Sequence, residues 1–503
     1  MTRPRAEPMA VTLAPDRAVT SDEVHDVAVH GHRLLVSAER LEQVRLASAV
    51  VERALARGRK IYGLNTYVGH LRDREIRQED LVDYQHQLLA MHARGIGDPM
   101  PVHDVRALML VRIVGMSHGG SGAHPDVFTM LIKLLNAGVH PVVPMGGSVG
   151  ASDLTQMAAV GMVLIGRGEA AYHGQILPAA EALARAGLEP CQLRPKDGLA
   201  LISANGMSVG MGALAVVEMD RLTQLADAIG CLSLEAVGGN LEPFGDEVAA
   251  AKPFAGQLSA AQHMRECLAG SYLERRVNGS SVQDALSFRV LPQVHGAMRE
   301  YIAFARRAVE VELNSSGDNP MVSIAGDDLI SNGNFDPLVL GLSFEALRLA
   351  LAHVAMISER RINRLRFHGI PAGRMADWRR RFPFRPYQGP SVHSAAALLA
   401  EIKHLANPVT MGSSLINPDA EDHSTLAPQS VTLTRTLVNR LETMLTIEAV
   451  MACDVLGDEV EPPVLGAGTQ PIYETVGLIT NELGENASAA AFCEAVRDSL
   501  FAH

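Results

Sequence analysis

Hydrophobic positions recur at helical spacing along most of the chain. Apolar side chains separated by steps of three and four residues lie on one face of a helix, which can then pack on a core. Two such series are Leu347, Leu351, Val354 and Ile357, and Leu437, Leu441, Met444 and Leu445. The pattern predicts a mainly α protein that contains long helices.

Few stretches alternate between apolar and polar residues as a half-buried strand does. Residues 33–41 and 321–333 are the candidates, and the second could form a hairpin. Glycine and proline gather in short loops between the helical stretches, and loops often carry chemistry. We expect a loop-rich N-terminal domain over 1–200 and a long helical bundle domain over 201–503.

Composition limits the classes of function. The chain has 503 residues, of which 47% are hydrophobic and 4% aromatic, so aliphatic side chains must fill a large core. A net charge of −12 disfavours nucleic acid and anionic membrane as main partners. A small-molecule substrate remains the expected partner.

The segments that mark cellular location predict a cytoplasmic protein. The five cysteines are scattered and odd in number, which fits a reducing compartment. The N-terminus has no apolar core typical of a secretory signal. The longest apolar runs, such as 157–166, are too short to cross a bilayer, so we expect no membrane partner.

Several motifs are weak signals of metal or nucleotide binding. The stretch "GGSVGAS" lacks the Gly-Lys-Ser/Thr of a phosphate loop. His118 and His124, like His30 and His32, have no partner at ligand spacing along the chain. We therefore predict no metal site.

The Gly-rich loops taken together resemble the histidine/phenylalanine/tyrosine ammonia-lyase superfamily of aromatic amino acid lyases. The similarity runs from about residue 55 to 460. The matching motifs are "YGLNT" (62–66), "HARGIG" (92–97), "GSVGAS" (147–152), "PKDGLAL" (195–201), "QDALSFR" (283–289), "PQVHGA" (292–297), "DNP" (318–320), "GNF" (333–335), "SERRI" (358–362), "EIKHL" (401–405) and "EDH" (421–423). The resemblance implies a long-helix bundle of the ammonia-lyase (fumarase/aspartase-like) type and a homotetramer whose active sites draw on several subunits.

In that superfamily an Ala-Ser-Gly triplet cyclises into a methylidene-imidazolone electrophile, the MIO group, when the glycine amide attacks the alanine carbonyl. Here Ala151 and Ser152 are followed directly by Asp153, so the triplet is degenerate. Glycine suits this step because it has no Cβ at a tightly bent position. We therefore expect no MIO group and no other cofactor.

Other positions around the electrophile also depart from the family pattern. Each replaces a residue that lies where the family makes, holds or uses the MIO group. The departures are Tyr67 and Val68 in "NTYVG", Ser203 in "LALISANGM", Leu286 in "QDALSFR", Asp336 and Leu338 in "GNFDPLV", and Ala420 in "DAEDH". The absence of one glycine could not by itself account for these substitutions.

Reactive residues survive at other family positions. The resemblance implies that Tyr62 removes the β-proton of the substrate and that Arg289 pairs with its carboxylate through a bidentate fork. A tyrosine has an unperturbed pKa of about 10, so this base needs an environment that stabilises its anion. Lys403 and Glu421 match catalytic positions that could polarise the ring. His92, Asn205 and Asn334 match positions that bind the substrate.

A base and a carboxylate clamp without the electrophile favour a substrate whose amine needs no activation. A trimethylammonium group has no N–H to lose and departs as neutral trimethylamine. The chain thus resembles the MIO-lacking, ergothionase-like branch, which eliminates trimethylamine from ergothioneine to give thiourocanate. Two alternatives stay open: an MIO-type histidine or aromatic amino acid ammonia-lyase that releases ammonia, and a catalytically inactive homologue. Whether the ring is thioimidazole, imidazole or phenyl also stays open.

Overall fold

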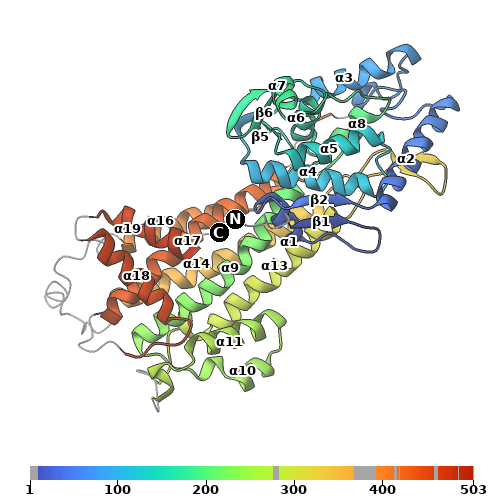
Figure 1. Cartoon of the computed structure of the whole chain (residues 1–503). Coiled ribbons are helices and arrows are strands. Elements are labelled where there is room, and N and C mark those ends of the chain that lie inside the picture. The colour runs from blue at the N-terminus through green and yellow to red at the C-terminus, as the bar shows by residue number, and fades with distance from the viewer. Residues whose placement is uncertain are drawn as a thin grey trace. The chain divides into compact units, whose positions relative to one another are not determined.

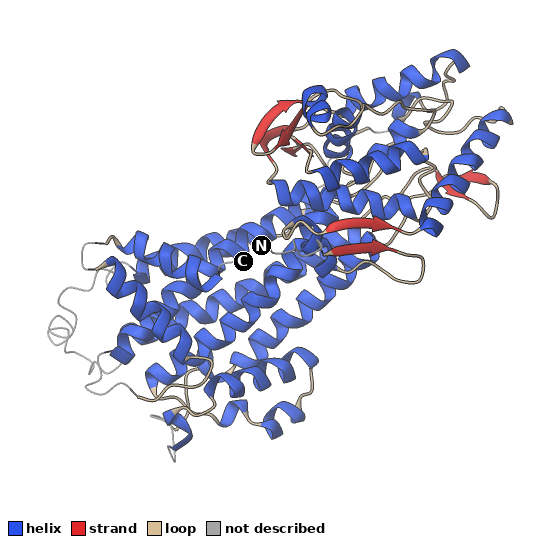
Figure 2. Cartoon of the chain, in the orientation of Figure 1, coloured by secondary structure: helices blue, strands red, loops and turns tan. Residues whose placement is uncertain are grey.

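The computed structural model describes residues 9–275, 282–367, 391–412, 416–417, 420–457, 463–484 and 487–501. Helices dominate these residues and strands are short, as Figure 2 shows in blue and red. The predicted mainly α class is therefore confirmed. The long helices are α9 (Gly206–Val237), α13 (Leu291–Leu313), α14 (Leu338–Arg366) and α17 (Ala427–Gly457) (Figure 1).

The chain divides into two compact units built from interleaved segments. The first unit is 1–217, 305–343 and 408–432, and the second is 218–304, 344–407 and 433–503. This division by contacts does not test the single boundary expected at residue 200, which stays a prediction.

The first unit contains the loops and most of the short elements. Its helices are α1 (Ser21–Ala28), α2 (Ala38–Ala56), α3 (Leu81–His92), α4 (Val102–Ser117), α5 (Pro125–Ala137), α6 (Leu154–Leu164), α7 (Ala179–Arg185) and α8 (Asp197–Ile202). Its strands are β1 (Ala10–Leu13), β2 (Arg33–Val36), β3 (Ile96–Pro99), β4 (His140–Pro141), β5 (Pro144–Gly146), β6 (Glu169–Tyr172), β7 (Gln175–Pro178), β8 (Met321–Ser323) and β9 (Asp328–Ile330).

The strands pair locally and form no large sheet among the described residues. β1 pairs with β2 in parallel, with Ala10 opposite Arg33, and β3 pairs with β5 antiparallel. β4, β6 and β7 form a three-stranded antiparallel sheet. The hairpin predicted over 321–333 is confirmed as β8 and β9, with Val322 opposite Leu329.

One expected strand is shorter than its pattern suggested. Of residues 33–41, only Arg33–Val36 is extended. Ser37 then caps α2 by accepting a hydrogen bond from the Arg40 amide at 3.3 Å. A serine that satisfies an otherwise unpaired helical amide favours helix initiation, which overrides the apolar alternation after it.

The second unit is a helical body with charged groups in its interior. It contains α10 (Asp246–Ala251), α11 (Ala255–Leu268), α12 (Leu286–Arg289), α16 (Ser391–Leu405), α18 (Gln470–Leu483) and α19 (Ala489–Phe501). Buried Arg361 of α14 pairs with buried Glu448 of α17 at 2.5 and 2.8 Å. Ser233 of α9 donates to the same carboxylate at 2.7 Å, so three long helices meet at one ionic contact.

The periodic apolar series occupy the core as predicted. Seven of those eight side chains are buried, and only Ile357 is half-buried. Two helical stretches are long and apolar enough to cross a membrane by length and composition: Asp197–Val237 and Leu338–Arg366. The uninterrupted apolar runs of the sequence are shorter, and so they did not predict such stretches. However, 94% and 67% of their most apolar windows are buried inside the protein, which accounts for their hydrophobicity.

Candidate active site

A cavity of about 840 Å³ lies within the first unit, where several loops converge. Its wall brings together segments that are far apart in the sequence. The lining residues are Lys60, Tyr62, Thr66, Arg72, Asp73, Ala151, Ser152, Leu154, Leu199, Ser203, Asn319, Ser331, Gly333, Phe335, Asp336, Ala420, Glu421, Asp422 and His423. Four residues of the predicted site, Tyr62, Ala151, Ser152 and Glu421, are therefore in one wall.

The loop that carries Tyr62 is anchored to the core of the unit. Ile61 and Leu64 belong to a buried cluster with α2, β8 and β9. Thr66 forms an antiparallel bridge with Glu75, which closes the loop on itself. These contacts leave the Tyr62 side chain on the cavity wall between two apolar anchors.

The Tyr62 hydroxyl accepts a hydrogen bond from the Gly69 amide at 3.2 Å. Burial raises the pKa of this phenol, and the Glu421 carboxylate raises it further. The Gly69 amide and the Arg72 guanidinium act in the opposite direction but do not cancel the rise in pKa. Tyr62 is consequently a neutral phenol at neutral pH while the cavity holds no further positive charge.

Glu421 is held at the cavity by its backbone. Its amide donates to the Asn417 carbonyl at 2.7 Å, and the Asn417 amide donates back at 3.2 Å. Two residues later, His423 Nδ1 lies 3.0 Å from an Asp336 carboxylate oxygen. The other Asp336 oxygen accepts from the Leu338 amide at 3.0 Å, at the start of α14. Carboxylates from two distant segments thus face one cavity.

The degenerate triplet lies in a tightly bonded turn. Ser152 has a φ of +63°, a left-handed conformation that is uncommon outside glycine. The Gly150 carbonyl accepts a hydrogen bond from the Thr425 hydroxyl at 2.8 Å. A Cβ at Gly150 would lie 2.2 Å from the Thr425 hydroxyl oxygen. Glycine is therefore required at 150 by close approach as well as by its φ of +81°.

The Asp153 side chain is completely buried behind this turn. Its carboxylate accepts from the Ser148 hydroxyl at 2.6 Å, and from the Ser208 amide and hydroxyl, each at 2.8 Å. Ser208 is in the first turn of α9, so Asp153 satisfies an amide that the helix leaves unpaired. Burial raises the pKa of Asp153, although all these hydrogen bonds oppose the rise.

These residues do not fit an MIO group. Cyclisation requires the amide nitrogen that follows Ser152 to attack the carbonyl of Ala151. That nitrogen belongs to Asp153, and its N–H donates to the Ala204 carbonyl at 2.7 Å. The Asp153 Cβ carries a carboxylate that is fixed in the interior, whereas the family's glycine carries no side chain.

A further acidic residue lies near the cavity. Burial raises the pKa of Glu312, at the end of α13, to about 7, and the nearby Asp336 carboxylate contributes to this rise. A hydrogen bond from Asn205 acts against it. Asn205 is itself buried and donates to the Phe335 carbonyl at 3.1 Å. Asn205 thus supports the cavity wall from behind, and its predicted contact with substrate stays a prediction.

The remaining predicted residues are not among those that line the cavity, although Asn334 lies between Gly333 and Phe335, which do. Asn334 is exposed, and its amide donates to the Asn332 side chain at 2.9 Å. His92 is half-buried at the end of α3, where its Nδ1 lies 2.8 Å from the Leu88 carbonyl oxygen. Arg289 ends α12 and Lys403 lies in the last turn of α16, both in the second unit. Their roles stay predictions.

Sequence reasoning missed several cavity residues. Lys60, Arg72 and Asp73 line the wall beside Tyr62, and Glu312 lies near it. The first three could have been found from their place next to "YGLNT" in the sequence. Glu312 carries no local signal, because only the folded chain brings it near Asn205.

Comparisons with known proteins agree on one family. A family model described as aromatic amino acid lyase matches residues 19–477. Histidine ammonia-lyase of Stigmatella aurantiaca is 37% identical over 460 residues, which are 90% of this chain and 89% of that protein. The histidine ammonia-lyase of Deinococcus radiodurans is 35% identical over 477 residues, with 94% and 90% covered.

Solved structures show the same fold. The phenylalanine aminomutase of Pantoea agglomerans superposes with a TM-score of 0.90 and is 26% identical, and the match covers 98% of this chain and 99% of that one. The ergothioneine-degrading ergothionase of Treponema denticola, in complex with desmethyl-ergothioneine sulfonic acid, superposes with a TM-score of 0.90. It is 27% identical to this chain, and the match covers 98% of each.

Proposed function

The chain belongs to the aromatic amino acid lyase family and is a carbon–nitrogen lyase, and we propose that it eliminates trimethylamine from ergothioneine, giving thiourocanate, without an MIO group. The observation that carries the proposal is the Asp153 amide. It occupies the position of the family's glycine nitrogen, but its N–H is bonded to the Ala204 carbonyl and its side chain is buried. A lyase without the electrophile needs a substrate whose leaving group is already activated.

A trimethylammonium group meets that need. A base removes the proton from Cβ, the C–H electron pair forms the Cα=Cβ double bond, and the C–N pair leaves with neutral trimethylamine. A primary ammonium would instead lose its own, more acidic N–H proton first. The thioimidazole ring of ergothioneine also makes the Cβ proton easier to remove, because negative charge that develops at Cβ spreads into the heterocycle.

Tyr62 is the proposed base, and the charges around it suggest the condition under which its phenol loses its proton. In the free chain its pKa is raised, chiefly by burial and also by Glu421. A substrate with a fixed positive charge in the same cavity would lower the pKa of the phenol. The base is then generated mainly when the betaine is bound, assisted by Arg72 and the Gly69 amide.

The charges of the cavity wall and its aromatic residue suit a positively charged group such as a quaternary ammonium. Asp73, Asp336, Glu421 and Asp422 supply four carboxylates to it, against Lys60 and Arg72 as fixed cations. Phe335 adds an aromatic ring directly before Asp336 in the chain, and aromatic faces attract quaternary ammonium groups. Asp336 is one of the departures from the family pattern, so we assign it the recognition of the trimethylammonium group.

The other roles follow the resemblance. Arg289 pairs with the substrate carboxylate, and Lys403 with Glu421 polarises the ring. His92 and Asn334 complete the binding of the substrate. Each of these roles is to be tested by substituting that residue alone and measuring the elimination rate.

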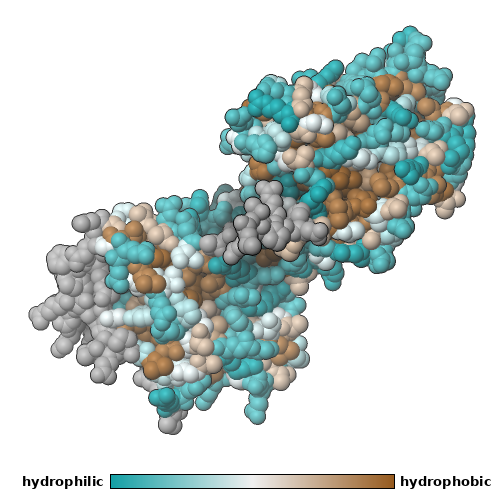
Figure 3. Space-filling model, viewed as in Figure 1, coloured by the Kyte–Doolittle hydropathy of each residue, from teal (hydrophilic) through white to brown (hydrophobic). Residues whose placement is uncertain are grey.

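We also propose a homotetramer. Val339, Leu342 and Leu349 are exposed on α14 at 59, 46 and 56% of their surface. Their spacing puts them on one stripe of the helix, and Figure 3 shows hydrophobic residues among the hydrophilic ones at the surface. Such a stripe is well suited to packing against another copy of the chain. We propose separately that the protein is cytoplasmic.

The test is a parallel assay of the purified protein with ergothioneine, histidine betaine and histidine. Product absorbance and the released amine are followed together. Trimethylamine from a betaine, with no ammonia from histidine, is the expected result. Ammonia from histidine would mean that the electrophile forms after all. Failure with all three substrates, by a folded tetramer, would favour the inactive homologue.

A further inference from the structure

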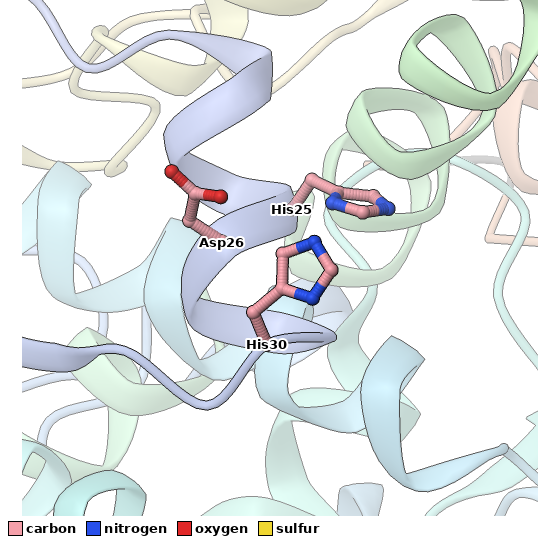
Figure 4. A group of neighbouring side chains, drawn as sticks. All are labelled: His25, Asp26 and His30. Carbon is pink, nitrogen blue, oxygen red and sulfur yellow. The ribbon is translucent and has the colours of Figure 1, made fainter. Parts of the chain in front are cut away.

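Three side chains with metal-binding atoms gather at the end of α1. His25 and Asp26 are in the last turns of this helix, and His30 is in the loop that leads to β2 (Figure 4). One ligand atom from each lies within 4.8 Å of the others. His32 adjoins the group, because its Nδ1 is 3.8 Å from an Asp26 carboxylate oxygen.

The backbone holds this group in place. The Val29 amide donates to the His25 carbonyl at 2.8 Å, and the His32 amide donates to the Asp26 carbonyl at 3.1 Å. Gly31 has a φ of +71°, which lets the loop turn back toward the helix. The residues are therefore brought together by a fixed turn rather than by long flexible side chains.

The other end of α1 is also fixed. Thr20 and Glu23 form a reciprocal capping box at its start. The Ser21 amide donates to a Glu310 carboxylate oxygen at 3.1 Å, and the Val19 amide donates to the Asn314 side chain at 2.8 Å. A helix anchored at its start offers a stable platform for ligands at its end.

The spacing of the ligand atoms is close to that of a metal site. In tetrahedral zinc sites, bonds of about 2.0–2.1 Å put ligand atoms roughly 3.3 Å apart. A separation of 4.8 Å would have to shrink by about 1.5 Å, which requires changes of side-chain rotamer on metal binding. Two or three imidazoles with one carboxylate favour zinc and similar transition metals over calcium or magnesium.

We propose that His25, Asp26 and His30, with His32 as a fourth ligand, bind one divalent transition-metal ion, with Zn²⁺ as its probe. This inference departs from the sequence-based prediction of no metal site, which stays a prediction. Spacing along the chain does not reveal the group, because His25 and Asp26 come from the preceding helix turn. None of the four lines the cavity, so the ion takes no part in the elimination. It would join the end of α1 to the loop before β2 and stabilise the N-terminal part of the first unit.

The experiment uses the full chain after treatment with a chelator and its removal. Calorimetric titration with Zn²⁺ should give saturable binding at one equivalent per chain, and Zn²⁺ should raise the melting temperature. Co²⁺ should give the visible absorption of a tetrahedral site. The steady-state rate of elimination should not change with either ion.

Variants decide whether these residues are the ligands. His30→Ala should reduce the zinc affinity at least tenfold and abolish the melting shift, and Asp26→Asn should weaken binding. His393→Ala, at an exposed helical histidine of the second unit, is the matched control and should bind as the parent does. Because His30 is in an exposed loop, circular dichroism should show an unchanged fold. Absence of saturable binding, or equal binding by the His30→Ala variant, would overturn the proposal.

Discussion

The buried Asp153 carboxylate gives a sharp test of how the cavity wall is held. Replacing it with alanine leaves the Ser208 amide uncapped, at a cost of about 1 kcal/mol. The Ser148 and Ser208 hydroxyls also lose their acceptor in the interior, which adds about 1–3 kcal/mol. We therefore expect the free energy of unfolding to fall by about 2–4 kcal/mol in Asp153→Ala.

Asp153→Asn should behave differently. The asparagine oxygen can still accept from the Ser208 amide, and its NH₂ group can donate to the two hydroxyls. Because burial raises the pKa of Asp153, its charged form is disfavoured in the folded protein. Its contribution to stability is therefore full at low pH and is lost as the pH rises through the raised pKa. Removing the charge offsets the loss of charge-assisted bonds, and the net change should stay within about 1 kcal/mol.

The assay is urea unfolding followed by circular dichroism at pH 7.5, with the elimination rate measured on the same samples. Asp126→Ala removes an exposed carboxylate near the start of α5 and is the control, with a change of about 0.5 kcal/mol or less. Equal destabilisation by alanine and asparagine would refute the reasoning, because it would show that the negative charge itself holds the turn.

Three further predictions concern the cavity. Tyr62→Phe should lower kcat at least ~100-fold with little change in KM, and retained turnover would exclude this residue as the base. Asp336→Asn should raise KM for the betaine roughly tenfold while the melting temperature stays near that of the parent, and an unchanged KM would remove Asp336 from substrate recognition. The folded pKa of Glu312 is raised to about 7 from an ordinary value of 4.5. Its contribution to stability is therefore full below pH 4.5 and is lost as the pH rises through about 7. Glu312→Gln should therefore flatten the dependence of melting temperature on pH between 4.5 and 8, and an unaltered slope would contradict the shift.

Much of the fold could be predicted from local pattern. Leu351 and Leu441 lie in apolar series whose period matches the helix, and both are completely buried. The hairpin at Val322 followed from alternation next to a turn. The interleaving of the two units was not predictable in this way, because it depends on which distant segments pack together.

The site was predictable where chemistry sits in a recognisable loop. Tyr62 and Glu421 were found from their motifs, and the structure puts both on one cavity. Glu312 was missed because its raised pKa arises from burial and from Asp336, neither of which the sequence displays. The His25 group was missed for a similar reason, since its spacing along the chain gives no hint that the loop turns back.

The bonding of the 148–153 turn to the start of α17 has a consequence for synthesis of the protein. Gly150 and Thr425, whose groups are hydrogen-bonded, are 275 residues apart in the chain. At about 5–20 residues per second, a ribosome would need roughly 15–55 s to make the intervening segment. The N-terminal loops must therefore wait, without their final partner, until most of the polypeptide has emerged. A nascent chain that stops before about residue 430 carries Tyr62 and Ser152 but has no completed pocket in which to use them.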